Sequence, residues 1–256
     1  MLSSHEELPR PKNYRLNRFH LFGRDIVLAG MARPDSNTFV DKAMRYVVET
    51  EGRTVLIGLK GEINFAEQTE PHGLQYIYIP ITDYVPAPVE AFDAFYDAVK
   101  ANILAGKQVA VHCGAGDGRT GSAFASLKMR ELMEKRAALD LRYLDQLGDT
   151  TTTVAVLGET VACTPLVKEA VERIRQERIA PDDSGKDAVE SAEDILGLVR
   201  YEQHLKVQIK NELMSKQSTV QYRGAMQPTL TESTELANDD NDENKCNIAG
   251  SGVVRG

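Results

Sequence analysis

Residues 107–121 read KQVAVHCGAGDGRTG, and this stretch decides the fold. Residues 107–113 have a centre of apolar and β-branched residues, Val-Ala-Val, as a buried strand does. Residues 114–121 contain four glycines around the start of a helical pattern at Arg119. Similar strand-like segments lie upstream at 25–30, 54–59 and 74–81, and helical patterns cover 88–105, 119–136, 165–178 and 191–215. This alternation predicts an α/β fold, a single domain whose central, largely parallel sheet is flanked by helices.

The helix boundaries carry signals of their own. Gly106 stands where a C-terminal cap is expected after 88–105, and Thr164-Pro165 supplies an N-cap followed by a first-turn proline. Ser191-x-x-Asp194 is a capping-box pattern at the start of the last helix. Residues 138–163 fit no long element, and we expect a loop or a small excursion there.

Composition divides the chain into three parts. Residues 1–12 are polar and contain two prolines, which predicts a flexible N-terminal lead, and residues 13–215 form the predicted domain. Residues 216–256 are dominated by Ser, Thr, Asn, Asp and Gly. The net charge of −8 (30 basic against 38 acidic residues) is concentrated between 232 and 245, so we expect a disordered acidic tail.

The same composition excludes several classes of protein. A broadly basic nucleic-acid surface is missing, and no apolar run approaches the roughly 18–20 residues of a membrane span. Cys113, Cys163 and Cys246 are widely spaced and form no CxxC pair, so neither a disulfide scaffold nor a zinc site is expected. We therefore expect a reducing, cytoplasmic location and no metal or cofactor, although export by a non-classical route would leave the same composition.

The glycine-rich turn predicts a cradle for a phosphate-sized anion. Its glycines let the chain curl so that backbone N–H groups point inward, and the start of the next helix adds further donors. The guanidinium can place two parallel bonds on phosphate oxygens. These donors favour the thiolate of Cys113, which becomes a nucleophile beneath the bound phosphoryl group. The predicted phosphate-binding residues are Gly114, Ala115, Gly116, Asp117, Gly118 and Arg119.

Two neighbours of the cradle have supporting roles in this interpretation. Thr120 is expected to donate its hydroxyl to the sulfur when the sulfur leaves phosphorus. His112 is expected to organise the loop through hydrogen bonds rather than to act as a base.

The ten residues HCGAGDGRTG, 112–121, resemble the signature loop of the cysteine-dependent protein tyrosine phosphatase superfamily, His-Cys-x-x-Gly-x-x-Arg-Ser/Thr-Gly, with every fixed position filled. The resemblance extends diffusely over about 14–213 and is closest to the compact, dual-specificity-like members. It implies hydrolysis of phosphomonoesters through a cysteinyl-phosphate intermediate. The implied substrates are phosphotyrosine, and also phosphoserine or phosphothreonine, in a protein, or a small phosphomonoester.

The resemblance also implies a general acid that protonates the leaving oxygen. Asp83 lies 30 residues before Cys113 (113 − 83 = 30), a spacing similar to that of the compact members. The alternative is that Asp83 only shapes a turn. Asp93 and Asp97 fall on the predicted helix and are expected to be solvated, and Tyr84 is expected to be an ordinary packed tyrosine.

The chain departs from the family pattern at positions that bear on water and substrate. Asp194 stands where many members carry a glutamine that positions the hydrolytic water. Members resembling the 3-phosphoinositide-specific type carry lysines at the positions of Gly114 and Asp117. A carboxylate about 4 Å from a second phosphate would cost about 4 kcal/mol at an effective dielectric of ~20, which disfavours a highly phosphorylated inositol.

Three other hypotheses remain open. The same chemistry would serve an inositol polyphosphate or phosphoinositide phosphatase. A non-catalytic phosphate-binding scaffold would keep the cradle without turnover, but Cys113, Arg119 and Asp83 are all present. A rhodanese-like or arsenate-reducing protein also uses Cys-x5-Arg, and Thr120-Gly121 favours a phosphatase over it. Whether Cys163 is a redox partner of Cys113, and how many copies of the chain assemble, are not determined by the sequence.

Overall fold

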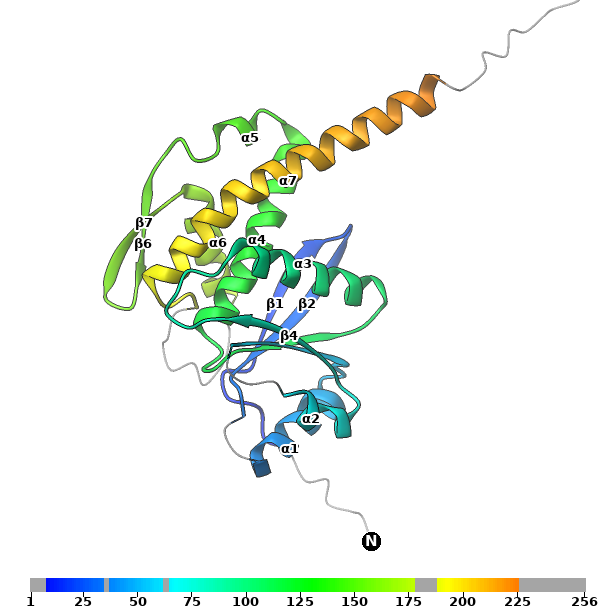
Figure 1. Ribbon diagram of the computed structural model, residues 1–256, viewed down its shortest axis with the longest axis vertical. Coiled ribbons are helices and arrows are strands. Elements are labelled where there is room, and N and C mark those ends of the chain that lie inside the picture. Colours follow the sequence, from blue (N-terminus) through cyan, green and yellow to red (C-terminus); the bar gives the residue numbers. More distant parts are fainter. Residues whose placement is uncertain (1–7, 35–36, 62–64, 178–187, 226–256) are drawn as a thin grey trace, which may run out of the picture. The chain divides into compact units, whose positions relative to one another are not determined.

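A five-stranded sheet forms the centre of the computed structural model, which describes residues 8–34, 37–61, 65–177 and 188–225 (Figure 1). The strands are β1 (Arg15–Leu21), β2 (Arg24–Met31), β3 (Val55–Lys60), β4 (Gln75–Ile81) and β5 (Val109–His112). Their spatial order is β1-β2-β5-β3-β4, with β1 antiparallel and the other neighbours parallel. The prediction of a largely parallel sheet is therefore confirmed, and β5, which precedes the glycine-rich turn, lies in its middle.

Strand β1 was not expected, because polar residues occupy its inward positions. Its burial alternates along the strand, with Arg15, Asn17, Phe19 and Leu21 turned inward. The first two of these interrupt the apolar alternation by which a half-buried strand is identified. The other four strands match the segments predicted for them.

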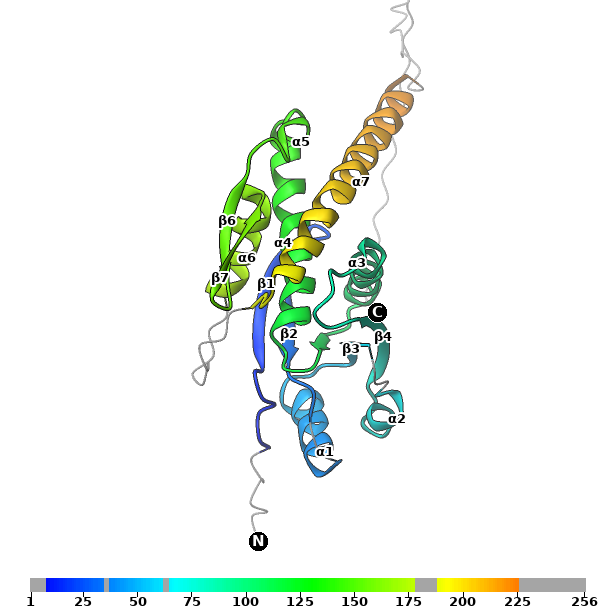
Figure 2. The same ribbon diagram turned by 60° about the vertical axis from the view of Figure 1, so that its left-hand side comes forward.

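Helices cover both faces of the sheet. Helix α1 (Asn37–Arg45), which continues into a π-helical turn at Tyr46–Thr50, and α2 (Ala66–Thr69), which continues into a 3-10 turn at Glu70–His72, lie on one face. The other face carries α3 (Val89–Leu104) and α4 (Gly118–Leu139), with α6 (Pro165–Gln176) packed against α4 (Figure 2). Each face has its own apolar core, as parallel strands buried on both sides require.

The predicted cap residues are confirmed, whereas the last helix extends ten residues beyond its predicted end at 215. Gly106 follows α3 at φ +76°, and Thr164 Oγ1 accepts a hydrogen bond from the backbone N–H of Val167 in α6. Ser191 and Asp194 cap α7 (Ala192–Ala225) reciprocally, each side chain accepting from the other's N–H at 3.1–3.2 Å. The predicted excursion at 138–163 consists of α5 (Tyr143–Gln146) and an antiparallel hairpin of β6 (Thr152–Val156) and β7 (Glu159–Cys163).

The chain separates into two units, residues 1–215 and 216–256. Helix α7 continues past residue 215 to Ala225, and the rest of the predicted tail, 226–256, lies outside the described residues. The first seven residues of the predicted lead also lie outside them, whereas Lys12 accepts a backbone hydrogen bond from Ala32. Over the described ranges, no helix combines the length and the apolar character that crossing a bilayer requires.

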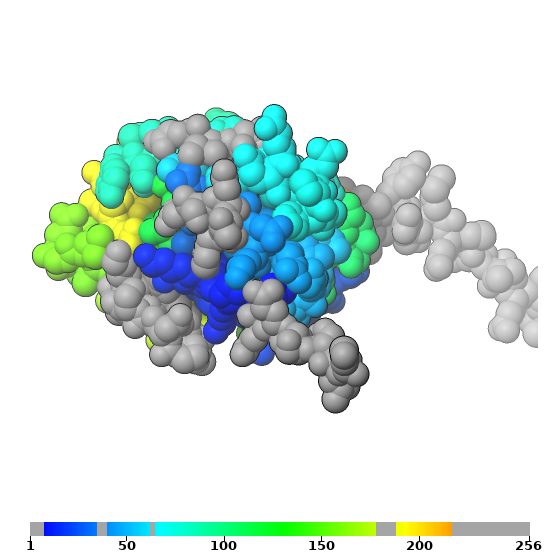
Figure 3. All heavy atoms as spheres, turned by 90° about the horizontal axis from the view of Figure 1, so that it is seen from below, coloured from blue at the N-terminus to red at the C-terminus, as the bar shows by residue number. Residues whose placement is uncertain are grey.

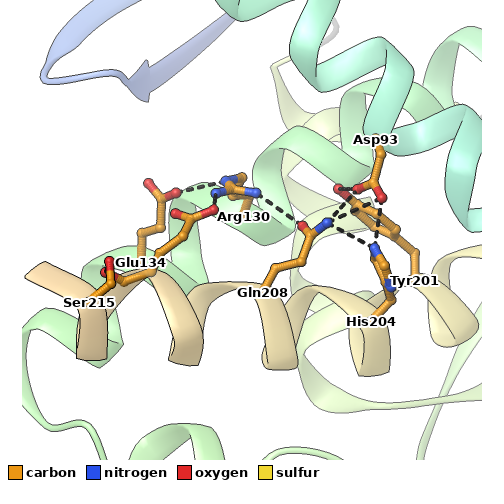
Figure 4. A network of polar contacts seen from close by, with 8 residues as sticks. Asp93, Arg130, Glu134, Tyr201, His204, Gln208 and Ser215 are labelled. Carbon is orange, nitrogen blue, oxygen red and sulfur yellow. Dashed lines mark hydrogen bonds and ion pairs between the residues drawn. The ribbon is translucent and has the colours of Figure 1, made fainter.

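A polar network attaches α7 to α3 and α4 (Figure 4). Arg130 of α4 contacts Glu134 at 2.8 Å and Glu212 of α7 at 2.5 Å, and its guanidinium lies 3.9 Å from the centre of the Tyr96 ring. Asp93 accepts hydrogen bonds from α7 side chains, including that of Gln208 at 3.2 Å. Asp93 is therefore a structural contact, and the prediction that it is merely solvated is wrong, whereas Asp97 is exposed.

We predict that Arg130→Ala lowers the free energy of unfolding by about 2 kcal/mol, because it removes a cation–π contact and leaves two half-exposed carboxylates without their partner. Urea unfolding measures this loss. Arg142→Ala is the matched control, since Arg142 is 84% exposed and pairs with Asp140 at the surface. It should cost no more than about 0.5 kcal/mol. Equal losses in the two variants would contradict a special role for the network.

Candidate active site

Strand β5 delivers Cys113 to the foot of a tight loop that ends at the start of α4. Cys113 directly follows the strand and is 2% exposed, and α4 begins at Gly118. The loop turns at Gly116, whose φ of +87° favours glycine. A Cβ there would also lie 2.5 Å from the backbone N of Ala32, so no other residue fits without displacing the neighbouring chain.

The backbone carbonyl groups of the loop are held from outside. Five consecutive carbonyl oxygens, those of residues 113–117, each accept a hydrogen bond from a group that surrounds the loop. The donors, in the order of the carbonyls, are His112 Nδ1 (3.2 Å), Arg33 N (2.8 Å), Asn13 Nδ2 (2.8 Å), Arg15 Nη2 and Gly121 N (2.8 Å).

This outer bonding turns the N–H groups of the loop inward. In a trans peptide the C=O and the following N–H point in opposite directions, so outward carbonyls at 113–117 direct the N–H groups of 114–118 to the inner side. The N–H of Gly116 donates to Cys113 Sγ at 3.2 Å. Together with the N-terminus of α4, these groups form a concave set of donors suited to a phosphate or a thiolate.

Arg119 and Asp83 meet over this loop. Arg119 Nη2 lies 2.8 Å from Asp83 Oδ2, and Nη1 donates to the carbonyl of Ile81 at 3.3 Å. The guanidinium also lies beside Gly114, where a Cβ would be 3.0 Å from Nη2. The structure thus brings the predicted arginine and acid together beside the loop of the predicted cysteine, and Asp83 lies in a turn that follows β4.

His112 is buried beneath the loop in the way predicted for an organising residue. Its Nδ1 bonds the carbonyl of Cys113, and its Nε2 lies 3.2 Å from Tyr76 Oη. Gly58 leaves the space for this pair, because a Cβ there would lie 1.8 Å from the tyrosine oxygen. Burial, together with the charges of Arg33 and Arg119, lowers the pKa of His112 to about 4, so the ring is neutral at pH 7.

Asp117 does not face the substrate side, contrary to our expectation. Its side chain is 0% exposed, and its carboxylate contacts Arg15 Nη1 at 3.1 Å and Asn13 Nδ2 at 3.0 Å. The charge is therefore neutralised beneath the loop. The repulsion invoked against a second phosphate on the substrate does not arise from this residue.

Thr120 and Asp194 also differ from what the family pattern implied. The Thr120 hydroxyl is buried and has no hydrogen-bond partner among the described residues, so it does not bond the sulfur here. Asp194 accepts from Ser122 Oγ at 2.9 Å and from the backbone N–H of Ser191 at 3.2 Å. Burial raises the pKa of Asp194. Its carboxylate thus connects the start of α7 to α4 and is engaged by the protein.

Two further residues lie where the sequence did not place them. Tyr84, next to Asp83, is 79% exposed, so the expectation of a packed tyrosine is wrong. Cys163 lies at the end of β7, where burial raises the pKa of its thiol, and both it and Cys113 are free. Among the described residues, no group of three or more His, Cys, Asp or Glu side chains is arranged to hold a metal ion.

Sequence analysis missed the outer donors Asn13, Arg15 and Arg33. The sequence does contain a signal for Arg15. In a strand with alternating burial, this charged residue falls on the same inward face as Phe19 and Leu21. Such a residue needs a buried partner. The identity of that partner depends on the position of β1 next to the loop, which no local pattern reveals.

We predict that the burial of His112 makes the protein less stable in acid. Between pH 6.5 and 4 the unfolded state binds a proton that the folded state excludes, so the free energy of unfolding falls as the pH falls. With those two pKa values the loss between pH 7 and 5 is about 2 kcal/mol. Urea unfolding at both pH values should show a smaller difference for His112→Asn than for the unaltered chain. An identical difference would contradict the prediction.

Comparison with protein families agrees with this geometry. Residues 29–132, from β2 to α4, match the family described as "Polymorphic toxin system, DSP-PTPase phosphatase". An uncharacterized protein of Methanocaldococcus jannaschii is 38% identical over 55 residues, which are 22% of this chain and 37% of that protein. The chain thus aligns with little more than a third of this relative.

Solved phosphatase structures resemble the chain at low sequence identity. Tk-PTP in its active form is 20% identical, with a TM-score of 0.44 and coverage of 69% of this chain and 91% of that one. The catalytic core of the PP-IP phosphatase SIW14 from S. cerevisiae is 12% identical, with a TM-score of 0.44 and coverage of 80% and 96%. Residues 29–132 thus match a dual-specificity-type protein tyrosine phosphatase family, and the loop at 112–121 carries the signature of the cysteine-dependent superfamily.

Proposed function

We propose that the chain hydrolyses aryl phosphomonoesters, phosphotyrosine in proteins first among them, through a cysteinyl-phosphate formed on Cys113. The observation that carries this proposal is the outward bonding of five loop carbonyls, which leaves inward N–H groups around the sulfur. A phosphate bound there takes the place that the Asp83 carboxylate now holds on Arg119. It then lies directly over the nucleophile.

The two steps follow from the positions of the side chains. The thiolate of Cys113 attacks phosphorus, the bond from phosphorus to the leaving oxygen breaks, and Asp83 gives that oxygen its proton. Asp83, now a carboxylate, takes a proton from water as the water oxygen attacks phosphorus. The phosphorus–sulfur bond then breaks, which releases inorganic phosphate and restores the thiolate. Arg119 and the loop N–H groups stabilise the charge on the phosphoryl oxygens in both steps.

The surroundings of the acid support an aromatic leaving group. Tyr84 and Val85 follow Asp83 directly and expose 79% and 51% of their surface. An exposed ring beside the acid offers a face on which a phosphotyrosine ring can stack. Because a thiolate nucleophile works only while it is reduced, we also place this activity in a reducing compartment such as the cytoplasm.

A second candidate substrate class is a small molecule with several phosphates, such as an inositol polyphosphate or a phosphoinositide. The observation that favours retaining it is the burial of the Asp117 carboxylate beneath the loop, where Arg15 neutralises it. The Asp117 carboxylate then does not repel a second phosphate on the substrate. Phosphate release from a phosphotyrosine peptide and from inositol hexakisphosphate, measured side by side, separates the two classes.

We predict that Cys113→Ser abolishes turnover of phenyl phosphate but keeps phosphate binding, whereas Arg119→Ala loses both. Asp83→Asn should slow kcat by roughly 10²–10³-fold, because the leaving phenolate no longer receives a proton. The loss should be smaller with para-nitrophenyl phosphate, whose leaving group needs less protonation. Steady-state kinetics on both substrates measures the difference.

The exposed Asp97 on α3 provides the matched control, and Asp97→Asn should keep the activity of the unaltered chain. If Asp83→Asn slows both substrates equally, Asp83 is not the acid. If Cys113→Ser still turns over, the mechanism itself is wrong.

We predict that Tyr84→Ala lowers kcat/KM for a phosphotyrosine peptide by about three- to tenfold, the value of one aromatic contact. It should leave hydrolysis of inositol hexakisphosphate unchanged, because that substrate has no ring to stack. A tyrosine far from the site, Tyr143→Ala, controls for the loss of an aromatic side chain. An equal effect of Tyr84→Ala on both substrates would exclude the proposed contact.

A further inference from the structure

Two side chains from the N-terminal part of the chain reach the outer side of the phosphate loop. Asn13 precedes β1, and its Nδ2 lies 2.8 Å from the carbonyl oxygen of Ala115 and 3.0 Å from Asp117 Oδ2. Arg15 begins β1, and its two terminal nitrogens contact the carbonyl of Gly116 and, at 3.1 Å, Asp117 Oδ1. The two donors thus hold adjacent peptide groups and the same carboxylate. Figure 3 shows that the blue N-terminal segment and the yellow start of α7 reach the same face of the molecule.

The charge at the centre of this arrangement is fully buried. Arg15 is 1% exposed and Asp117 0%. Removing two such charges from water costs about as much free energy as their attraction returns, so the pair adds little to net stability. What it adds is direction, because a guanidinium donates hydrogen bonds only in its plane and the carboxylate fixes that plane.

The loop needs such an external constraint at one position. Gly116 has a φ of +87°, and glycine adopts positive and negative φ about equally well. The peptide groups on either side of it can therefore rotate unless other contacts hold them. These are the groups that Asn13 and Arg15 hold. If either peptide turned over, a carbonyl oxygen would face the sulfur in place of an N–H.

We propose that Asn13 and Arg15 are positioning residues of the phosphatase, which keep the carbonyls of Ala115 and Gly116 turned away from the sulfur. Asp117 is the anchor that orients them both. The proposal concerns the site of the proposed function, but it is testable through phosphate binding alone, without turnover. Its consequence is that Asn13 and Arg15 support the site although they lie about 100 positions from Cys113 along the chain.

The first test measures binding of inorganic phosphate by calorimetry in a Cys113→Ser background. Asn13→Ala should weaken binding roughly five- to tenfold, the value of about one hydrogen bond to a polar group. Arg15→Lys keeps the charge opposite Asp117 but lacks the fork that also reaches Gly116, and it should weaken binding similarly. Arg18→Met is the matched control, since Arg18 is exposed on the same strand, and it should bind phosphate like the parent chain.

The second test follows alkylation of Cys113 by iodoacetamide as a function of pH in the full chain, with the modified peptide identified by mass spectrometry. In Asn13→Ala and in Arg15→Lys the onset of alkylation should move to higher pH, because fewer N–H groups face the sulfur. Urea unfolding shows that each variant is folded. A merely structural role would lower stability and leave this pH profile unchanged.

The proposal is overturned if folded Asn13→Ala and Arg15→Lys bind phosphate and react with iodoacetamide like Arg18→Met. If the proposed function is wrong, the experiments give a different result. In that case the unaltered chain would show no turnover of any phosphomonoester, while the effect of Asn13 and Arg15 on phosphate binding would persist.

Discussion

The site depends on the direction of five peptide groups. A glycine-rich loop has no intrinsic reason to present its N–H groups on one side, because the same flexibility that allows the curl allows its reversal. Here each carbonyl from 113 to 117 is bonded on the outside, by donors that lie just before β1, at the start of β1, after β2, at the end of β5 and in α4. The nucleophile, the anion site and the helix N-terminus acquire their electrostatics from this constraint.

The same constraint explains why the loop tolerates an acidic residue. A carboxylate among phosphate-binding residues would oppose an anionic substrate if it faced inward. Asp117 instead lies beneath the loop, where it orients Arg15 and Asn13. The identity of a variable loop residue therefore says little about substrate until the direction of its side chain is known. In the proposed function, a substrate meets the exposed ring of Tyr84 and the guanidinium of Arg119 instead.

Much of the fold followed from local pattern, and the failures have physical causes. The strands β2 to β5 and the helices α3, α4 and α6 were predicted because their apolar periodicity and end signals agree. Strand β1 was missed because Arg15 and Asn17 occupy inward positions. A charged residue there is stabilised by a partner about 100 residues away, and local propensity contains no information about such a contact.

In the candidate site, too, some features follow from local sequence and others depend on tertiary packing. Cys113 and Arg119 were predicted because their proposed roles depend on a contiguous loop, and Asp83 was predicted through the resemblance to a family. The orientation of Asp117 and the lone hydroxyl of Thr120 depend on packing between elements, and both were expected otherwise. The residues within a loop can thus be predicted from its sequence. The residues that hold the loop in place come from distant parts of the chain, and local sequence does not predict them.

The hydrogen bonds from Asn13 and Arg15 to the loop have a consequence for the order of events in folding. Contacts that join segments so distant along the polypeptide form only once the intervening sheet has assembled, since closing a long segment is entropically unfavourable until other contacts compensate. The sulfur therefore gains its reactive environment as one of the last events of folding. Until those contacts form, the peptide groups on either side of Gly116 are free to turn over.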